Sequence, residues 1–273
     1  FSRDSSLHHS PQKNTTSLAM KIKIRNLKFS YPNFSLEIPD LILEEGQVTT
    51  IVGPNGAGKT TLLKCLSGLL TIPSGSVLIN GQDLNAIKGS RRAQLIGYVP
   101  QEMTSIFNYT VLDFVLMGRA AYLHLFSLPS EADKQLALEA LAYIGLRDYA
   151  QRHLFELSSG ERRLVLIARA LAQQAQILYL DEPTTFLDPK NEIEILELIK
   201  KLSQEMKKTI VLTLHNLEMA AAYSNSLVFI KKGQVRAWGK PDEIMTEDLL
   251  EEIYGVKIKI IDWNGHKFLI KGK

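Results

Sequence analysis

The sequence predicts an α/β fold with a mixed sheet, an antiparallel β subdomain and a helical subdomain. A short apolar strand at residues 47–52 is followed by a glycine-rich loop and an expected helix at 59–66. Two further apolar strands, 177–180 and 209–214, enclose a segment, 192–207, with the spacing of an amphipathic helix. Because strand, helix and strand follow in this order, these strands are expected to be parallel.

The first part of the chain carries a different pattern. Residues 21–29 alternate apolar and polar side chains, and residues 34–43 also look extended. Both segments predict antiparallel strands. Residues 1–19 are polar, rich in serine and threonine and without periodicity, so we interpret them as a disordered or non-native leader, with Met20 as the natural start.

The middle and the end of the chain complete the predicted organisation. Residues of about 104–172 are mostly helical in pattern, including an expected helix at 131–144. The last residues, 256–273, hold two apolar runs around Asn264-Gly265, which predicts a β-hairpin extension. The main domain is therefore expected at 20–255, with the helical subdomain inside it.

Composition limits the classes of function. Hydrophobic residues make up 45% of the 273 residues and charged residues 22%, which is ordinary for a globular protein. The net charge of +3 does not suggest the concentrated basic surface of a nucleic-acid binder. The single cysteine, Cys65, lies in an apolar run and is expected to be a buried side chain in a reducing compartment. No run approaches the roughly 18 apolar residues of a membrane span, so action on a membrane would need another chain.

The glycine-rich loop predicts a phosphate site. Residues 53–60 match G-x-x-x-x-G-K-[ST] in full, between a strand and a helix. Glycines let successive N–H groups point inward at phosphate oxygens, and the following helix places its positive end there. Lys59 can reach the β- and γ-phosphates, and the Thr60 hydroxyl can hold Mg²⁺. The expected nucleotide-binding residues of this loop are Gly53, Pro54, Asn55, Gly56, Ala57, Gly58, Lys59, Thr60 and Thr61.

A pair of acids ends the strand at 177–180. In a parallel sheet, ligands lie at the carboxyl ends of strands, so Asp181 is expected beside the phosphate loop, where it can bind Mg²⁺. Glu182 is expected to face the γ-phosphate and to polarise the attacking water. The alternative is a solvated acidic strand end, closed by Pro183.

Further motifs bring a family resemblance. The segment Leu157, Ser158, Ser159, Gly160, Glu161, Arg162 and Arg163 resembles the L-S-G-G-Q signature of ABC ATPases, in the L-S-G-G-E-R form common among importers. The remaining motifs of that family follow the expected order. Gln101 matches the Q-loop, residues 185–188 with Asp188 match the D-loop, His215 matches the switch histidine, and Tyr31 fits the aromatic that stacks on adenine. The likeness covers about residues 20–255.

The resemblance implies a P-loop NTPase core, ATP and Mg²⁺ as cofactors, and an ATPase activity. Glu182, His215 and Gln101 would be catalytic, and Thr60, Gln101 and Asp181 would hold the metal. In this family the signature covers the nucleotide of a partner chain, so it implies a homodimer in the ATP-bound state. It also implies membrane-spanning permease subunits, an indirect link to a substrate-binding protein, and a peripheral place on the cytoplasmic face of the cell membrane.

The helix after the signature is expected at 161–173, with an apolar stripe of Leu164, Ile167 and Leu171. Its N-terminus, with a hydroxyl and a glycine, is a second candidate anion site, although Ser158 can also act as a plain N-cap. Ser159 stands where the family usually has glycine. Its Cβ would cost energy if the backbone there needed a positive φ.

The branch of the family is suggested by residues 111–119 and 251–256, which look like ATPases serving iron–siderophore, haem and vitamin B12 importers. Molybdate, zinc and manganese importers have similar subunits, and a non-transport ABC-type ATPase is a further alternative. A P-loop kinase would leave the signature and His215 unexplained. The segment after Gln101 is expected to receive a helix of the membrane subunit through the side chains Met103, Ile106, Phe107 and Tyr109.

Overall fold

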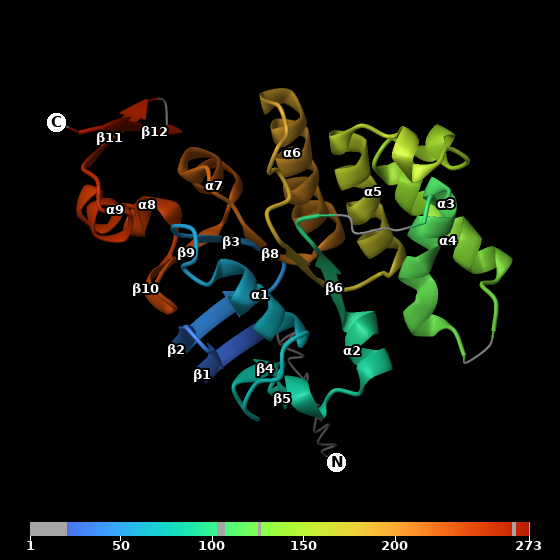
Figure 1. Ribbon diagram of the computed structural model, residues 1–273, viewed down its shortest axis with the longest axis horizontal. Coiled ribbons are helices and arrows are strands. Elements are labelled where there is room, and N and C mark those ends of the chain that lie inside the picture. The colour runs from blue at the N-terminus through green and yellow to red at the C-terminus, as the bar shows by residue number, and fades with distance from the viewer. Residues whose placement is uncertain (1–20, 103–106, 125–126, 264–265, 273) are drawn as a thin grey trace, which may run out of the picture.

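The computed structural model describes residues 21–102, 107–124, 127–263 and 266–272, and shows one ten-stranded sheet, flanking helices and a separate two-stranded hairpin (Figure 1). The strands are β1 (Lys21–Tyr31), β2 (Phe34–Glu44), β3 (Val48–Val52), β4 (Val77–Ile79), β5 (Gln82–Asp83), β6 (Ile96–Val99), β7 (Ile177–Leu180), β8 (Thr209–Thr213), β9 (Ser226–Lys231), β10 (Gln234–Gly239), β11 (Ile258–Trp263) and β12 (His266–Lys271). The α-helices are α1 (Lys59–Ser67), α2 (Gly89–Leu95), α3 (Val111–Leu116), α4 (Glu131–Tyr143), α5 (Ser159–Ala172), α6 (Pro189–Met206), α7 (Leu217–Tyr223), α8 (Pro241–Ile244) and α9 (Glu247–Tyr254). Short 3-10 helices are η1 (Leu84–Ala86), η2 (Met117–Tyr122), η3 (Arg147–Tyr149) and η4 (Leu154–Glu156).

The sheet is mixed, which confirms the predicted fold class. Its order is β5-β4-β1-β2-β10-β9-β3-β8-β7-β6. Strands β9, β3, β8, β7 and β6 pair in parallel, whereas β1, β2, β4 and β5 pair antiparallel. The carboxyl ends of β3, β6, β7 and β8 therefore meet at one edge of the sheet, which is where ligands bind in such sheets.

Two apolar cores cover the two faces of the parallel strands. Along β7, Tyr179 belongs to the core shared with α1 and the antiparallel strands, whereas Leu178 and Leu180 belong to the core shared with α5 and α6. Successive side chains of a strand point to opposite faces, so a strand buried on both sides reads as a continuous apolar run. Cys65 of α1 is fully buried, as expected, and burial raises the pKa of its thiol to about 12.

Helices α3, α4 and α5 form a group to one side of the sheet (Figure 1). Helix α5 begins at Ser159, two residues earlier than expected, because the N-cap Ser158 and the N3 residue Glu161 form a capping box across its first turn. Helix α6 begins at Pro189, three residues earlier than expected, because Asp188 is its N-cap and proline is favoured at the first helical position. The side chains of Leu164 and Leu171 are only partly buried, so the apolar stripe predicted for α5 does not coincide with the most buried face of the helix.

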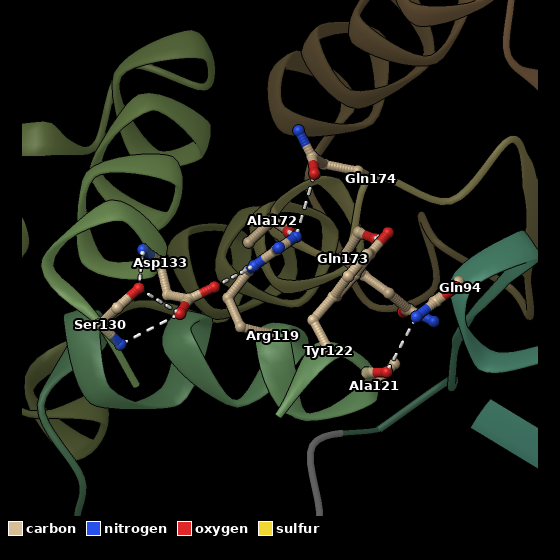
Figure 2. Close-up of polar contacts among 9 residues, drawn as sticks. All are labelled: Gln94, Arg119, Ala121, Tyr122, Ser130, Asp133, Ala172, Gln173 and Gln174. Atoms are coloured by element: carbon tan, nitrogen blue, oxygen red, sulfur yellow. Dashed lines mark hydrogen bonds and ion pairs between the residues drawn. The ribbon is translucent and has the colours of Figure 1, made fainter. Parts of the chain in front are cut away.

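Figure 2 shows the polar contacts that join the start of α4 to the end of α5. Arg119 Nε donates to Asp133 Oδ1 at 2.9 Å, and its NH1 donates to the carbonyl of Ala172 at 2.8 Å. The guanidinium carbon of Arg119 lies 3.8 Å from the ring centroid of Tyr122. Asp133 also accepts from the Ser130 hydroxyl at 2.6 Å, at the N-cap of α4. Arg119 of η2 therefore links the two helices, through its ion pair with Asp133 of α4 and its hydrogen bond to Ala172 of α5.

The hairpin of β11 and β12 lies beside α7 and α9. Its strands pair antiparallel from Ile258↔Lys271 to Trp263↔His266, and the Asn264-Gly265 turn lies outside the described residues. The outward N–H of Ile260 donates to Glu247 at 3.1 Å, and that of Leu269 donates to Glu218 at 2.7 Å. Carboxylates from α9 and α7 thus each accept one outward N–H, one on each edge of the hairpin. Across the ranges described above, no helix is long and apolar enough to cross a membrane.

Candidate active site

The phosphate loop joins β3 to α1 and depends on glycine at two positions. Gly53 has φ of 157°, and a Cβ on it would lie 2.1 Å from the Ile230 carbonyl oxygen. Gly58 has φ of 106°, and a Cβ there would lie 2.6 Å from the Phe34 ring. Neither position can accept a side chain without displacing its neighbours. The loop is therefore packed into one conformation by β9 on one side and β2 on the other.

Lys59 begins α1 and is only 6% exposed. Its ammonium donates to the carbonyls of Gly53 at 2.9 Å and Pro54 at 3.3 Å. Burial lowers the pKa of Lys59, while the charges of Glu182 and Asp181 oppose that shift. The ammonium thus lies inside the loop with its charge balanced by two acids, which is the arrangement that a phosphate-binding lysine needs.

Asp181 follows β7 and is buried at the base of the site, with three hydroxyl groups around its carboxylate. Thr60 and Thr213 donate to Oδ1 at 3.0 and 2.9 Å, and Tyr98 donates to Oδ2 at 3.2 Å. Burial raises the pKa of the Tyr98 hydroxyl, and Asp181 raises it further. The sequence-predicted Thr60 and Asp181 are thus in direct contact, while the motif analysis gave no role to Tyr98 or Thr213.

Glu182 is the meeting point of three expected site elements. Gln101 Nε2 donates to its Oε2 at 2.6 Å, and His215 Nε2 lies 2.6 Å from its Oε1. Thr185 donates to Oε2 at 3.1 Å, and Thr213 accepts the backbone N–H of Glu182 at 2.8 Å. The backbone of Glu182 has φ of 46°, which is uncommon for a side-chain-bearing residue.

A pocket of about 540 Å³ opens over the phosphate loop. Lys59, Thr60, Thr61 and Glu182 line it together with Tyr31, which is 45% exposed. The other residues along its wall are Asn33, Phe34, Asn55, Gly56, Ala57 and Gly58. Asn33 and Phe34 were not among the expected site residues, because a residue in a β-turn or at a strand start carries no sequence signal for a nucleotide.

The signature residues lie apart from this pocket. Ser158 accepts the N–H of Glu161 at 3.2 Å, and Glu161 accepts the N–H of Ser158 at 2.7 Å. Ser159 is exposed and helical, so the strain considered for a serine at this position does not arise. A Cβ on Gly160 would lie 3.2 Å from Asn191 Cγ, at the start of α6. Ser159 instead lines a separate pocket of about 240 Å³.

Asp188, the expected D-loop acid, caps α6 beside the signature. It accepts the N–H of Asn191 at 3.0 Å and the Asn191 side-chain amide at 2.5 Å. The backbone hydrogen bond from Asn191 contributes most to lowering the pKa of Asp188, and the side-chain hydrogen bond lowers it further. Phe186, two residues earlier, is 83% exposed with φ of 64°.

Comparison with known proteins places the chain in a family. The family profile described as "ABC transporter" matches residues 36–185, more than half of the chain. The ferric enterobactin transport ATP-binding protein of Escherichia coli is 37% identical over 84% of this chain and 83% of its own length. A phosphonates import ATP-binding protein of Lactococcus lactis is 34% identical over 85% of this chain and 98% of its own length.

Solved structures agree with this placement. A structure of an ABC transporter assigned to the metal-chelate type, in an inward-facing conformation, has a TM-score of 0.80 at 32% identity, over 92% of this chain and 96% of that chain. A dimeric bacterial ABC transporter cassette has a TM-score of 0.69 at 29% identity, over 80% and 98% of the two chains. The fold and the site thus define a P-loop ATPase, an enzyme that binds and hydrolyses ATP. The chain belongs to the ABC transporter family.

Proposed function

We propose that this chain is the ATP-hydrolysing subunit of an importer, and that the cargo is an iron chelate, haem or vitamin B12. The proposal rests on the likeness to the ferric enterobactin protein and to the metal-chelate type transporter, both above 30% identity over most of the chain. The phosphonate relative is the specific observation that favours another cargo. Molybdate, zinc or manganese import, and a non-transport ATPase, are the remaining alternatives.

In this proposal Glu182 is the general base for the attacking water. Its carboxylate lines the phosphate pocket and is oriented by Gln101 and His215, each at 2.6 Å. Lys59 and the N–H groups of the loop bind the β- and γ-phosphates. Tyr31, at the rim of the pocket, stacks on the adenine.

Mg²⁺ fits the residues beside the loop. The Thr60 hydroxyl and the Asp181 carboxylate are hard oxygen donors 3.0 Å apart, which suits an ion that takes most of its ligands from phosphate and water. The side-chain nitrogen of Gln101 donates to Glu182, so its side-chain carbonyl oxygen remains available as the third proposed Mg²⁺ ligand. When bound, the ion neutralises charge on the β- and γ-phosphates.

The active enzyme is proposed to be a homodimer in the ATP-bound state. Ser158, Ser159 and Gly160 lie outside the phosphate pocket of their own chain, and the start of α5 is a suitable site for an anion. Leu157 and Glu161 complete the signature. Each signature would close the nucleotide pocket of the partner, and the D-loop with Asp188 would lie at the contact.

The proposed place of the subunit is peripheral, on the cytoplasmic face of the membrane, bound to permease subunits that receive cargo from a substrate-binding protein. The exposed Phe107 and half-exposed Tyr109 belong to the proposed permease contact, while Met103 and Ile106 lie outside the described residues. We retain 20–255 as the ATPase domain, 104–172 as its helical subdomain and 256–273 as an extension.

Purification of the native complex tests this function. The tagged chain should bring with it membrane-spanning permease subunits, and vesicles containing the complex should take up a ferric siderophore only when ATP is supplied. Uptake of a phosphonate in place of the chelate would reject the proposed cargo. Isolation of the chain with DNA or ribosomes, and without a membrane protein, would reject the transport function.

A further inference from the structure

Arg163 is a buried cation that the proposed chemistry leaves without a role. It lies on α5 at the end of the signature-like segment, one turn after the first residue of the helix, Ser159, and is 8% exposed. Its NH1 donates to the carbonyl of Pro100 at 3.1 Å. Burial lowers the pKa of this guanidinium, and the charges of Glu102, Glu182 and Asp181 oppose the shift. An arginine keeps its charge in proteins, so the side chain is a fixed donor among acids.

The carbonyl that Arg163 binds belongs to the start of the Q-loop. Strand β6 ends at Val99, and the Val99 carbonyl accepts the N–H of Asp181 at 2.9 Å. Pro100 is the first residue past this ladder, and a partly buried carbonyl there needs a donor from elsewhere. The guanidinium supplies that donor and fixes the direction in which the chain leaves the sheet.

The next residue along the chain is Gln101, whose amide donates to Glu182 Oε2 at 2.6 Å. A continuous set of contacts thus runs from α5 through Arg163, the Pro100 carbonyl and Gln101 to the carboxylate of Glu182. Gln101, Arg163 and Thr185 also line the same pocket of about 240 Å³, with Ser159 of the signature. Helix α5 therefore carries signature residues in its first turn and, through Arg163, also holds the start of the Q-loop.

We propose that Arg163 is a positioning residue for ATP hydrolysis, which fixes Gln101 and thereby the carboxylate of Glu182 through its hydrogen bond to the Pro100 carbonyl. This inference rests on the proposed roles of Gln101 and Glu182. Neither Arg163 nor Gln101 lines the nucleotide pocket, so we expect the main effect on turnover and only a small effect on nucleotide affinity. Displacement of a reacting group by about 1 Å is enough to lower a rate by roughly 100-fold.

The experiment measures kcat and KM for ATP with the purified full chain. We expect Arg163→Met to lower kcat by roughly 10- to 100-fold with KM within about twofold of wild type. Arg163→Lys should recover most of the loss, because an ammonium can still donate to one carbonyl. Arg169→Met is the matched control, since Arg169 lies on the same helix with its guanidinium carbon 4.9 Å from the Phe114 ring centroid.

A double-mutant cycle with Gln101→Ala separates positioning from folding. Non-additive losses, with Arg163→Met adding less than twofold to Gln101→Ala, would support the inference. If Gln101→Ala lowers turnover and Arg163→Met adds its full factor, the Arg163 inference fails and the proposed function stands. If Gln101→Ala keeps wild-type turnover, the proposed role of Gln101 fails, and this inference with it. If Arg169→Met lowers kcat as much as Arg163→Met does, the effect of Arg163 is explained by a general loss of fold stability, and the inference is overturned.

Discussion

The Nε2 atom of His215 lies 2.6 Å from the Oε1 atom of Glu182, and the two residues come from the ends of different parallel strands, β8 and β7. Gln101, just past the end of β6, donates to the other carboxylate oxygen. Parallel pairing of these strands brings the three ends together, although the residues are far apart in the sequence. Both oxygens of the Glu182 carboxylate are thus held in place beside the pocket over the phosphate loop, as the proposed general base requires.

Replacement of Glu182 by Gln tests its proposed role as the general base. We expect kcat for ATP to fall roughly 100-fold or more, because the amide cannot take a proton from the attacking water, while ATP affinity changes little. Phosphate release at saturating Mg-ATP measures the first quantity, and calorimetric titration measures the second. The exposed Glu194→Gln is the control, and unchanged turnover in Glu182→Gln would remove this residue from the role of base.

Replacement of Lys59 by Ala tests the phosphate loop. The variant loses a buried ammonium, so we expect the Kd for ATP to rise roughly 10- to 100-fold, the usual cost of losing hydrogen bonds to a charged group. Binding of a fluorescent ATP analogue measures the effect, and thermal melting checks that the protein remains folded. Lys64→Ala, on the same helix α1, should keep wild-type affinity. Normal affinity in Lys59→Ala would contradict the assignment of the loop.

The ion pair of Arg119 and Asp133 predicts a pH dependence of stability. Hydrogen bonds from Ser130 and Arg119 lower the pKa of Asp133 to about 2, below the value of about 4 in an unfolded chain. A lowered folded-state pKa contributes stability that is present above about pH 4 and is lost as the pH falls toward 2. Asp133→Asn should therefore be less stable than wild type at pH 7, and the difference should narrow between pH 4 and 2.

Urea unfolding across this pH range is the measurement for Asp133. Glu131→Gln, whose carboxylate is 92% exposed in the same first turn of α4, is the control and should follow the wild-type curve. A difference between Asp133→Asn and wild type that stays constant from pH 7 to pH 2 would show that the carboxylate charge does not stabilise the fold.

The hydroxyl of Tyr179 predicts a stabilising substitution. Tyr179 is fully buried on β7, and within the described ranges its hydroxyl has no hydrogen-bond partner. A buried, unpaired polar atom costs stability, so Tyr179→Phe should raise the free energy of unfolding by about 1 kcal/mol. Differential scanning calorimetry should show a melting temperature roughly 2 °C higher. A lower melting temperature would mean that the hydroxyl is bonded in solution.

The sequence was most informative where a motif and its local structure coincide. The phosphate loop lies between β3 and α1 as expected, and Asp181 and Glu182 follow β7 at the predicted position. Short-range sequence patterns were enough to place these two motifs, because the residues of each motif determine the local backbone structure around it. The helix starts at Ser159 and Pro189 were placed two to three residues late. Ser158 was considered as an N-cap, but the helix was counted only from Glu161, and Asp188 was interpreted as a D-loop acid and not as the cap of α6.

The rest depends on contacts that no local pattern contains. Strands β4 and β5 and strand β6 are two to four residues long, too short for a periodic signal. Thr213 and Tyr98 reach Asp181 because β6, β7 and β8 are neighbours in the sheet, and strand order is set by packing of the whole domain. Arg163 likewise meets Pro100 across 63 positions of sequence.

The sedimentation behaviour of the Glu182→Gln variant tests the two-copy arrangement most directly. With Mg-ATP present the variant should sediment as a dimer, and without nucleotide it should sediment as a monomer, because in the proposed arrangement each signature closes the nucleotide pocket of the other copy. The Lys59→Ala, Glu182→Gln double variant should stay monomeric with Mg-ATP. A Glu182→Gln chain that binds Mg-ATP and still sediments as a monomer, alone and with its permease partners, would contradict the account.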